Sequence, residues 1–139
     1  MATWAKIEVD PQDIPNGARG IRFPFVTPDT QRGINVRVED SNIDSLFYFE
    51  APDFNNQEAR LNGDSSSVYS GFVINTDQQY FISLVADFST LTVDCFIDGS
   101  LAMSTTFTDQ NAEGQVYRFV LSSGETSEYV YVGNLEVLT

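Results

Sequence analysis

Apolar and polar residues alternate with a period of two along nearly the whole chain, and this pattern limits the possible folds more than any other feature. Turn-forming runs such as "NGDSSS", "IDGS" and "SSGET" separate the alternating segments, and no segment keeps the period of an amphipathic helix. About ten or eleven short strands with frequent turns predict an all-β fold, a two-sheet antiparallel β-sandwich of the jelly-roll type. The expected strands cover residues 5–9, 19–26, 33–40, 44–51, 58–62, 68–75, 80–88, 91–99, 101–108, 115–123 and 128–138, within a single domain spanning 1–139.

The composition supports a folded core and limits the partners of the protein. Of the 139 residues, 42% are hydrophobic and 13% are aromatic, which is typical of a globular domain. The net charge is −13, and the basic residues, Lys6 and six arginines, are scattered along the chain. Nucleic acids and anionic membranes attract clustered lysine and arginine side chains, so neither is an expected partner.

The absence of histidine and the presence of a single cysteine exclude several kinds of chemistry. Ser–His and Cys–His nucleophile pairs cannot form, an internal disulfide cannot form, and zinc lacks its usual ligands. Acidic pairs such as Asp40 with Asp44, or Asp94 with Asp98, could bind calcium, but the "D-x-D-x-D-G" pattern is absent and turn formation explains these residues as well. We therefore expect no enzymatic activity, no cofactor and no metal, and we place Cys95 in the core.

The first residues, "MATWAKIEVD", lack the apolar centre of a signal peptide. No apolar run reaches the length of a membrane span, so we expect no membrane insertion. The sequence predicts synthesis in the cytoplasm, with non-classical export or incorporation into a particle as the routes of release. Trp4, the only tryptophan, is expected to anchor the core or a sheet edge.

Residue parity assigns the side chains of four central strands to two faces. Phe47 and Phe49 point inward, whereas Leu46, Tyr48 and Glu50 point outward. The same parity places Ile34, Val36, Val38, Ala59, Leu61, Phe72 and Ile74 inside. If these strands are neighbours, their outer side chains form one polar surface of Asn35, Arg37, Glu39, Tyr48, Glu50, Arg60, Asn62 and Tyr69.

This polar surface has two interpretations. The first is a solvated face with Arg–Glu pairs, such as Arg37 with Glu50 or with Glu39, each worth about 0.2–1 kcal/mol. The second is a sugar-binding face, because tyrosine rings can cover the apolar side of a sugar ring while polar side chains such as Glu50 and Asn62 bond its hydroxyls.

A collinear series of short motifs extends over nearly the whole chain: "DIPNGARGIRFPF", "RGINVRVED", "DSLFYFEAPDF", "EARLNG", "VYSGFV", "QYFISLVADF", "LTVDCFIDGS" and "YVYVGNLEVLT". In order and spacing this series resembles a galectin carbohydrate-recognition domain. The hairpin "VADFSTLTVDCFIDG" is also similar to laminin-G-like and wider concanavalin-like sandwiches. Both resemblances imply the same architecture, two antiparallel sheets packed face to face.

The galectin resemblance implies candidate ligand-binding residues by position. Tyr48 stands at the histidine, Glu50 at the asparagine and Asp53 at the arginine of the galectin "H-F-N-P-R-F" motif. Tyr69 stands at the stacking tryptophan, and Asn62 keeps the asparagine of the "V-x-N" strand. Carboxylates thus replace donors, which implies a non-standard site and argues against β-galactoside binding in the family's manner. With one arginine added from the polar surface, the candidate ligand-binding residues are Arg37, Tyr48, Glu50, Asp53, Asn62 and Tyr69.

The resulting hypothesis is a non-enzymatic, lectin-like glycan-binding module that could form a homo-oligomer. Acidic residues on the polar surface favour neutral over sulfated or sialylated glycans. The alternative from a different class is a structural or assembly protein, such as a viral coat, spike or decoration protein, built on the same sandwich. A third alternative, a sandwich glycosidase or lyase, requires a deep cleft with two facing carboxylates.

Overall fold

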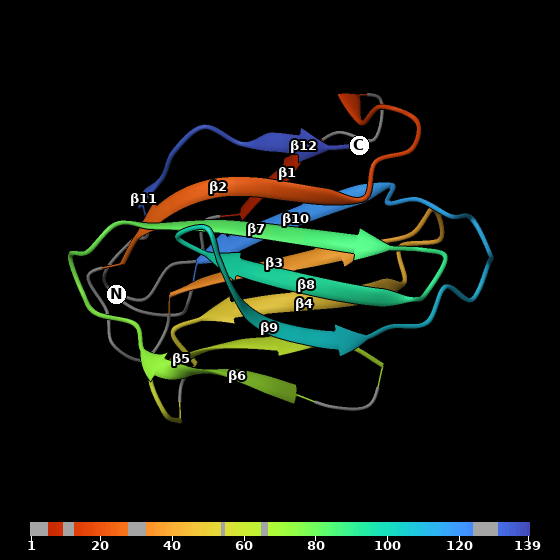
Figure 1. Cartoon of the computed structure of the whole chain (residues 1–139). Helices are drawn as coiled ribbons and strands as arrows, with labels where there is room; N and C mark the ends of the chain where they lie inside the picture. Colours follow the sequence, from red (N-terminus) through yellow and green to blue (C-terminus); the bar gives the residue numbers. More distant parts are fainter. Residues whose placement is uncertain (1–5, 10–12, 28–32, 54, 65–66, 124–130) are drawn as a thin grey trace.

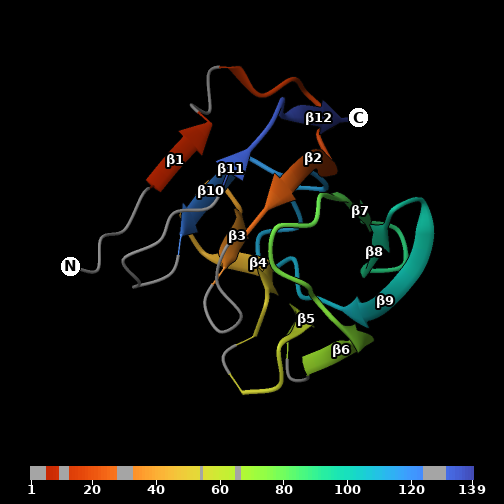
Figure 2. The same cartoon turned by 90° about the vertical axis from the view of Figure 1, so that its left-hand side faces the viewer.

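The protein is a sandwich of two antiparallel β-sheets (Figures 1 and 2), as the alternation predicts. The computed structural model describes residues 6–9, 13–27, 33–53, 55–64, 67–123 and 131–139. Trp4 lies outside these residues. Within the described part of the chain there is no α-helix, and no helix has the length and apolar character needed to cross a membrane.

The first sheet has six strands in the order β1-β10-β3-β4-β5-β6. The second sheet has the order β11-β2-β7-β8-β9, and β12 also pairs with β2. The strands of the first sheet are β1 (Lys6–Val9), β3 (Ile34–Glu39), β4 (Ser45–Ala51), β5 (Glu58–Asn62), β6 (Ser67–Val73) and β10 (Arg118–Ser123). Those of the second are β2 (Gly20–Val26), β7 (Tyr80–Asp87), β8 (Thr92–Ile97), β9 (Ser100–Thr106), β11 (Tyr131–Val132) and β12 (Glu136–Leu138).

The predicted strand over 128–138 is divided in two where it is described. Its first three residues lie outside the described residues, and the rest forms β11 and β12 on the same side of β2. The division occurs opposite Pro24, which has no N–H to donate. The N–H of Gly133 bonds the Pro24 carbonyl at 3.0 Å, and a Cβ at Gly133 would lie 2.5 Å from the proline ring. The chain therefore passes too close to Pro24 for a regular strand to continue there.

The core lies between the two sheets and is built by period-two alternation from both sides. Inward residues such as Val36 and Phe49 of the first sheet, and Leu84 and Cys95 of the second, are fully buried. Burial raises the pKa of the Cys95 thiol above its ordinary value. The placement of Cys95 as a small core residue is therefore confirmed.

Phe107 joins aromatic side chains of the two sheets. Its ring lies 5.5 Å from that of Phe47 and 5.1 Å from that of Phe88, centre to centre, and the second pair is edge to face. Such contacts add about 0.5–1.5 kcal/mol each to the energy of burial. Phe107 thus fixes the sheets together where β9 ends.

The prediction that Phe72 points inward is wrong, because a bulge displaces it. Arg60 pairs with Tyr69 but Glu58 pairs with Val73, so β6 carries two extra residues at this point. Gly71 has a φ of +82°, and the hydroxyl of Ser70 bonds the Phe72 carbonyl at 2.8 Å. Phe72 is therefore 43% exposed. The inward parity resumes only at Ile74, which is buried as predicted.

A second register shift changes the expected environment of Leu46. Glu39 pairs with Ser45 while the preceding Val38 pairs with Phe47, which leaves Leu46 without a partner across the strand pair. A bulge changes the direction in which the side chain of such an extra residue points. Leu46 is 3% exposed rather than outward in solvent.

Glu39 was expected on the exposed polar surface but is only 2% exposed. Arg37 covers it from the same strand, with Nε 2.6 Å from Glu39 Oε2. Arg118 of the neighbouring strand covers its other oxygen, with Nη1 3.6 Å from Oε1. Burial of a charge requires such partners, and Glu39 has two.

Candidate functional site

Strand register brings the candidate residues of β3, β4, β5 and β6 onto one face of the first sheet. Tyr48 of β4 lies opposite Arg37 on one side and Asn62 on the other. One step along, Glu50 lies opposite Arg60, which in turn lies opposite Tyr69. The predicted convergence of these side chains is therefore confirmed. We call this set the polar face: Arg37, Tyr48, Glu50, Arg60, Asn62 and Tyr69.

Arg60 occupies the centre of the polar face. Its Nη2 donates to Tyr48 Oη at 2.7 Å and to Glu50 Oε2 at 2.7 Å. Its guanidinium carbon lies 5.4 Å from the centre of the Tyr48 ring. Burial acts to lower the pKa of Arg60, but Glu50, Tyr48 and Asp53 outweigh it, so the pKa is raised. Arg60 is a fixed cation that holds Tyr48 and Glu50 in place.

Asp53 lies beneath the polar face rather than on it. Its carboxylate Oδ1 is 3.4 Å from Arg60 Nε, and its Oδ2 accepts the N–H of Asn55 at 3.1 Å. Its own N–H donates to the Glu58 carbonyl at 2.7 Å, which closes the β4–β5 connection over it. The side chain is 2% exposed. The expected position of Asp53 at a ligand surface is thus corrected: it contacts Arg60 and the turn, not solvent.

The Arg–Glu pairs of the polar face differ in part from those expected. Arg37 pairs with Glu39, as one alternative proposed, and its Nη2 also donates to the Ile43 carbonyl at 3.1 Å. Glu50, the other alternative partner of Arg37, pairs with Arg60 at 2.7 Å. The guanidinium of Arg37 is half exposed and remains accessible at the margin of the face.

Asn62 and Tyr69 form the side of the polar face next to the sheet edge. The side-chain oxygen of Asn62 accepts the Ser67 hydroxyl, so the amide group is oriented by its neighbour on β6. Tyr69 is 38% exposed. The face therefore offers the aromatic surface of Tyr69 to solvent beside the amide of Asn62.

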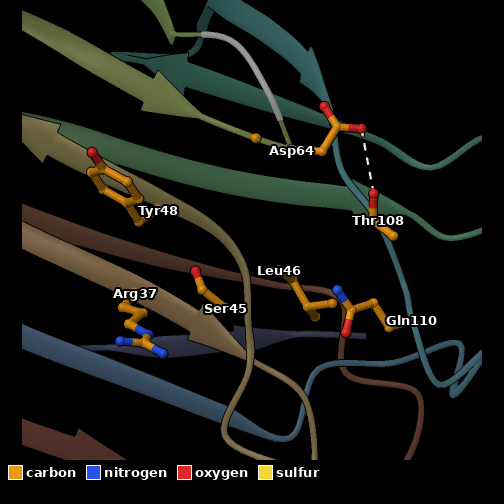
Figure 3. A pocket seen from close by; sticks show the side chains of 8 residues that line it. Arg37, Ser45, Leu46, Tyr48, Asp64, Thr108 and Gln110 are labelled. Atoms are coloured by element: carbon orange, nitrogen blue, oxygen red, sulfur yellow. Dashed lines mark hydrogen bonds between the residues drawn. The ribbon is translucent and has the colours of Figure 1, made fainter.

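A pocket of about 460 Å³ adjoins the polar face where β4 begins and β5 ends (Figure 3). Arg37 and Tyr48 line one side, and Asp64 and Thr108 line the side nearest β5 and β9. The remaining lining comes from Gly63, Ser45, Leu46 and Gln110.

The acidic loop pairs considered for calcium take part in local hydrogen bonds. Asp40 Oδ1 accepts the N–H groups of Asn42 and Asp44 at 2.9 and 3.0 Å. Asp98 accepts the N–H of Phe81 at 2.8 Å, as expected of a turn carboxylate. Among the described residues, no group of three or more acidic or cysteine side chains could hold a metal ion.

Sequence reasoning included Arg37 and Tyr48 in the candidate site but left out Arg60 and the other pocket residues. Residue parity did place Arg60 on the polar surface. Its position between two other polar residues that parity allows on that surface, Glu58 and Asn62, was the signal that could have identified it. Asp64, Thr108 and Gln110 lie in loops, and no motif marks them. They reach the polar face only because the two sheets meet there.

No protein-family model matches the chain, and no curated protein matches it either. Solved structures match along nearly its full length. A sialidase superposes on 98% of this chain with a TM-score of 0.78 and 16% identity, but the chain spans only 14% of that protein. A tetrameric galectin from the ball sponge Cinachyrella sp. has a TM-score of 0.70 and 16% identity, with 99% of this chain and 100% of the galectin covered. The Crh5 transglycosylase has a TM-score of 0.70 and 15% identity, with 99% and 70% covered.

These likenesses establish a galectin-like sandwich. At such low identity they define the fold alone, and the similar structures include both a galectin and proteins named as enzymes. The chemistry of the polar face therefore has to be argued from its own side chains.

Proposed function

We propose that the protein is a non-enzymatic, lectin-like module that binds a neutral glycan across the polar face. The observation that carries this proposal is the register that places Tyr48, Glu50, Asn62 and Tyr69 side by side on one sheet of a galectin-like sandwich. Sugar sites combine aromatic surface with a few fixed polar groups, and this face offers both.

Each part of the face has a role in this proposal. The Tyr69 ring packs against the apolar side of a sugar ring, and Tyr48 does the same at the centre. Glu50 and Asn62 bond sugar hydroxyls, as an acceptor and as a mixed donor and acceptor. Arg37 supplies donors at the margin. Asp53 acts indirectly by orienting Arg60.

Arg60 replaces a hydrogen-bond donor that the non-standard site lacks relative to the galectin motif. At the position of the galectin arginine stands Asp53, in the connection after β4, so a donor is lost there. Arg60 brings a guanidinium back from β5, between Glu50 and Asp53. Donors and acceptors therefore stand at positions that differ from those of the galectin motif. Such an arrangement favours a sugar other than a β-galactoside bound in the galectin manner.

The charge of the protein favours neutral glycans. The net charge is −13, and Glu50 and Asp64 lie at the face and the adjoining pocket. A sulfated or sialylated ligand would be repelled by the overall negative charge of the protein.

The placement of the carboxylates supports binding without catalysis. Glycoside hydrolysis needs one carboxylic acid that donates a proton and a second carboxylate across the bond. Glu50 and Asp53 both pair with the guanidinium of Arg60, and the side chain of Asp53 is only 2% exposed, so the two carboxylates do not face each other across an open cleft.

A glycan array followed by titration calorimetry tests the proposal. We expect neutral glycans to bind, and Glu50→Gln and Asn62→Ala to weaken the best ligand about tenfold each, the effect of losing one hydrogen bond of about 1.4 kcal/mol. Arg22→Gln, on the second sheet, is the matched control and should leave affinity unchanged. The absence of binding to any neutral glycan would contradict the proposal.

A second candidate, an assembly protein, is favoured by the outer side of the second sheet. Phe81, Leu101 and Tyr131 are 49%, 59% and 58% exposed there. A shallow pocket of about 240 Å³ lies beside Tyr131 and is lined partly by Pro24 and Val132. Solution mass by light scattering tests this candidate. A stable oligomer that dissociates on Phe81→Ser would support assembly through the second sheet. A symmetric interface that covers Tyr48 and Tyr69 instead would favour assembly over sugar binding.

A further inference from the structure

We infer that the pocket beside Tyr48 is a second saccharide subsite, so that the module recognises neutral oligosaccharides of at least two residues rather than single sugars. This inference rests on the proposed function of the polar face and extends it to the adjoining loops that carry Asp64, Thr108 and Gln110.

The β3–β4 bulge places one apolar side chain, Leu46, at the pocket. Leu46 is the extra residue opposite Val38 and Glu39, and it lies at 3% exposure between the strand and the pocket. Without the bulge, residue parity would direct the Leu46 side chain outward into solvent. The bulge thus supplies an apolar side chain in an otherwise mainly polar lining, and saccharide sites combine both kinds of surface.

The far wall is rigid because the end of β5 is attached to β9 of the other sheet. The Asp64 N–H donates to the Thr106 carbonyl at 3.1 Å, and Asp64 Oδ1 accepts the Thr106 hydroxyl at 3.2 Å. Asp64 Oδ2 lies 3.5 Å from the Thr108 hydroxyl, as the dashed line in Figure 3 marks. A Cβ at Gly63 would lie 1.8 Å from the Thr106 carbonyl oxygen, so only glycine allows this approach. The wall is formed before any ligand arrives, which lowers the entropic cost of binding.

The residues that line the pocket include both hydrogen-bond donors and hydrogen-bond acceptors, and sugar hydroxyls need both. Arg37 is a donor, the Asp64 carboxylate is an acceptor, and the Gln110 amide is both. Ser45 and Thr108 contribute hydroxyls, which can donate or accept a hydrogen bond. The cation and the carboxylate oppose one another across the pocket, so a ligand with a net charge of either sign meets one repulsive group. A neutral polyol is the ligand that this set fits best.

Tyr48 connects the pocket to the polar face. Its hydroxyl accepts from Arg60 on the polar face, and the same residue lines the pocket. A saccharide stacked near Tyr48 therefore has its next residue directed toward Asp64 and Gln110. The pocket volume of about 460 Å³ lies within the range of about 300–1,000 Å³ typical of small-molecule sites.

Titration of the full chain with a monosaccharide and with its unbranched trisaccharide tests the inference. The probes are glucose, mannose and galactose with their neutral linear trisaccharides, measured by calorimetry and by amide NMR shifts. We expect one trisaccharide to bind at least tenfold more tightly than its monosaccharide, and to shift the Gly63 amide and the Gln110 side-chain amide.

Two variants separate the subsite from the polar face. Ser45→Ala combined with Gln110→Ala should lower the ratio of trisaccharide to monosaccharide affinity about tenfold, as expected for losing two hydrogen bonds of modest strength. Asn134→Ala, between β11 and β12 at the opposite edge of the second sheet, is the control and should keep the ratio.

The outcomes distinguish the two proposals. Equal affinity for both lengths, or a length effect that the double variant leaves unchanged, overturns the subsite and leaves the proposed function standing. Failure of every saccharide to bind overturns both.

Discussion

Arg60 and Tyr48, on neighbouring strands, contact each other in two ways at once. Arg60 Nη2 donates to the Tyr48 hydroxyl at 2.7 Å, while the guanidinium carbon lies 5.4 Å from the centre of the Tyr48 ring. The second distance is within cation–π range. Together the two contacts fix the aromatic ring that both the polar face and the pocket use.

Replacing Arg60 should destabilise the fold strongly. Arg60→Leu leaves the Asp53 carboxylate buried without its cation, and removal of one partner of such a pair costs about 3–5 kcal/mol. Urea denaturation measures this loss in the free energy of unfolding. Combining Arg60→Leu with Asp53→Asn should recover part of it, because the buried charge is then gone.

Arg22 provides the matched control for this prediction. It pairs with Glu136 at 3.6 Å, and both side chains are more than half exposed. Arg22→Leu should therefore cost about 0–1 kcal/mol. A loss for Arg60→Leu no greater than for Arg22→Leu would contradict the central role of Arg60.

Gly63 and Gly71 should respond differently to alanine. At Gly63 the added Cβ meets the Thr106 carbonyl oxygen, so the attachment between β5 and β9 must open, with a cost of about 1–3 kcal/mol or more. At Gly71 the space is open and only the φ of +82° resists the side chain, at about 1–2 kcal/mol. Thermal melts of both variants show which substitution lowers the stability more. Hydrogen exchange of the Asp64 amide should rise in Gly63→Ala alone; unchanged exchange there would refute the proposed attachment.

Two phenylalanines of the first sheet should differ sharply in their contribution to stability. Phe49 is fully buried, so Phe49→Ala should lower the free energy of unfolding by about 3–5 kcal/mol. Phe72 is displaced by the β6 bulge, so Phe72→Ala should change it by less than about 0.5 kcal/mol. Chemical denaturation compares the two directly. Similar losses would mean that Phe72 belongs to the core after all.

Cys95 should be unreactive in the folded protein. Burial raises the pKa of its thiol, so the reactive thiolate is disfavoured and the sulfur is inaccessible. A disulfide reagent should label it only at the rate of unfolding, and at once in denaturant. Because the folded state holds this proton more tightly, Cys95 leaves stability unaffected below the ordinary thiol pKa and lowers it as the pH rises above that value. Rapid native labelling would be incompatible with this placement.

The period of two was sufficient to predict the sandwich and the common face of Tyr48 and Asn62, because alternation fixes which side chains share a side. Parity fails at Leu46 and Phe72, where a bulge adds residues to one strand only, and single-strand patterns do not reveal such insertions. The contact between Asp53 and Arg60 depends on the pairing of β4 with β5, which spacing along the chain leaves open. Gln110 joins the pocket through the meeting of two sheets, which no local pattern encodes.

The ion pairs of the first sheet should make the proposed binding of a neutral glycan insensitive to dissolved salt. Arg37 and Arg118 lie beside Glu39, and Arg60 lies beside Glu50 and Asp53, so the charges there nearly cancel although the chain carries −13 overall. Mobile ions weaken attraction or repulsion only where an uncompensated field exists. An uncharged molecule approaching this region would be held equally well in dilute buffer and at the salinity of seawater.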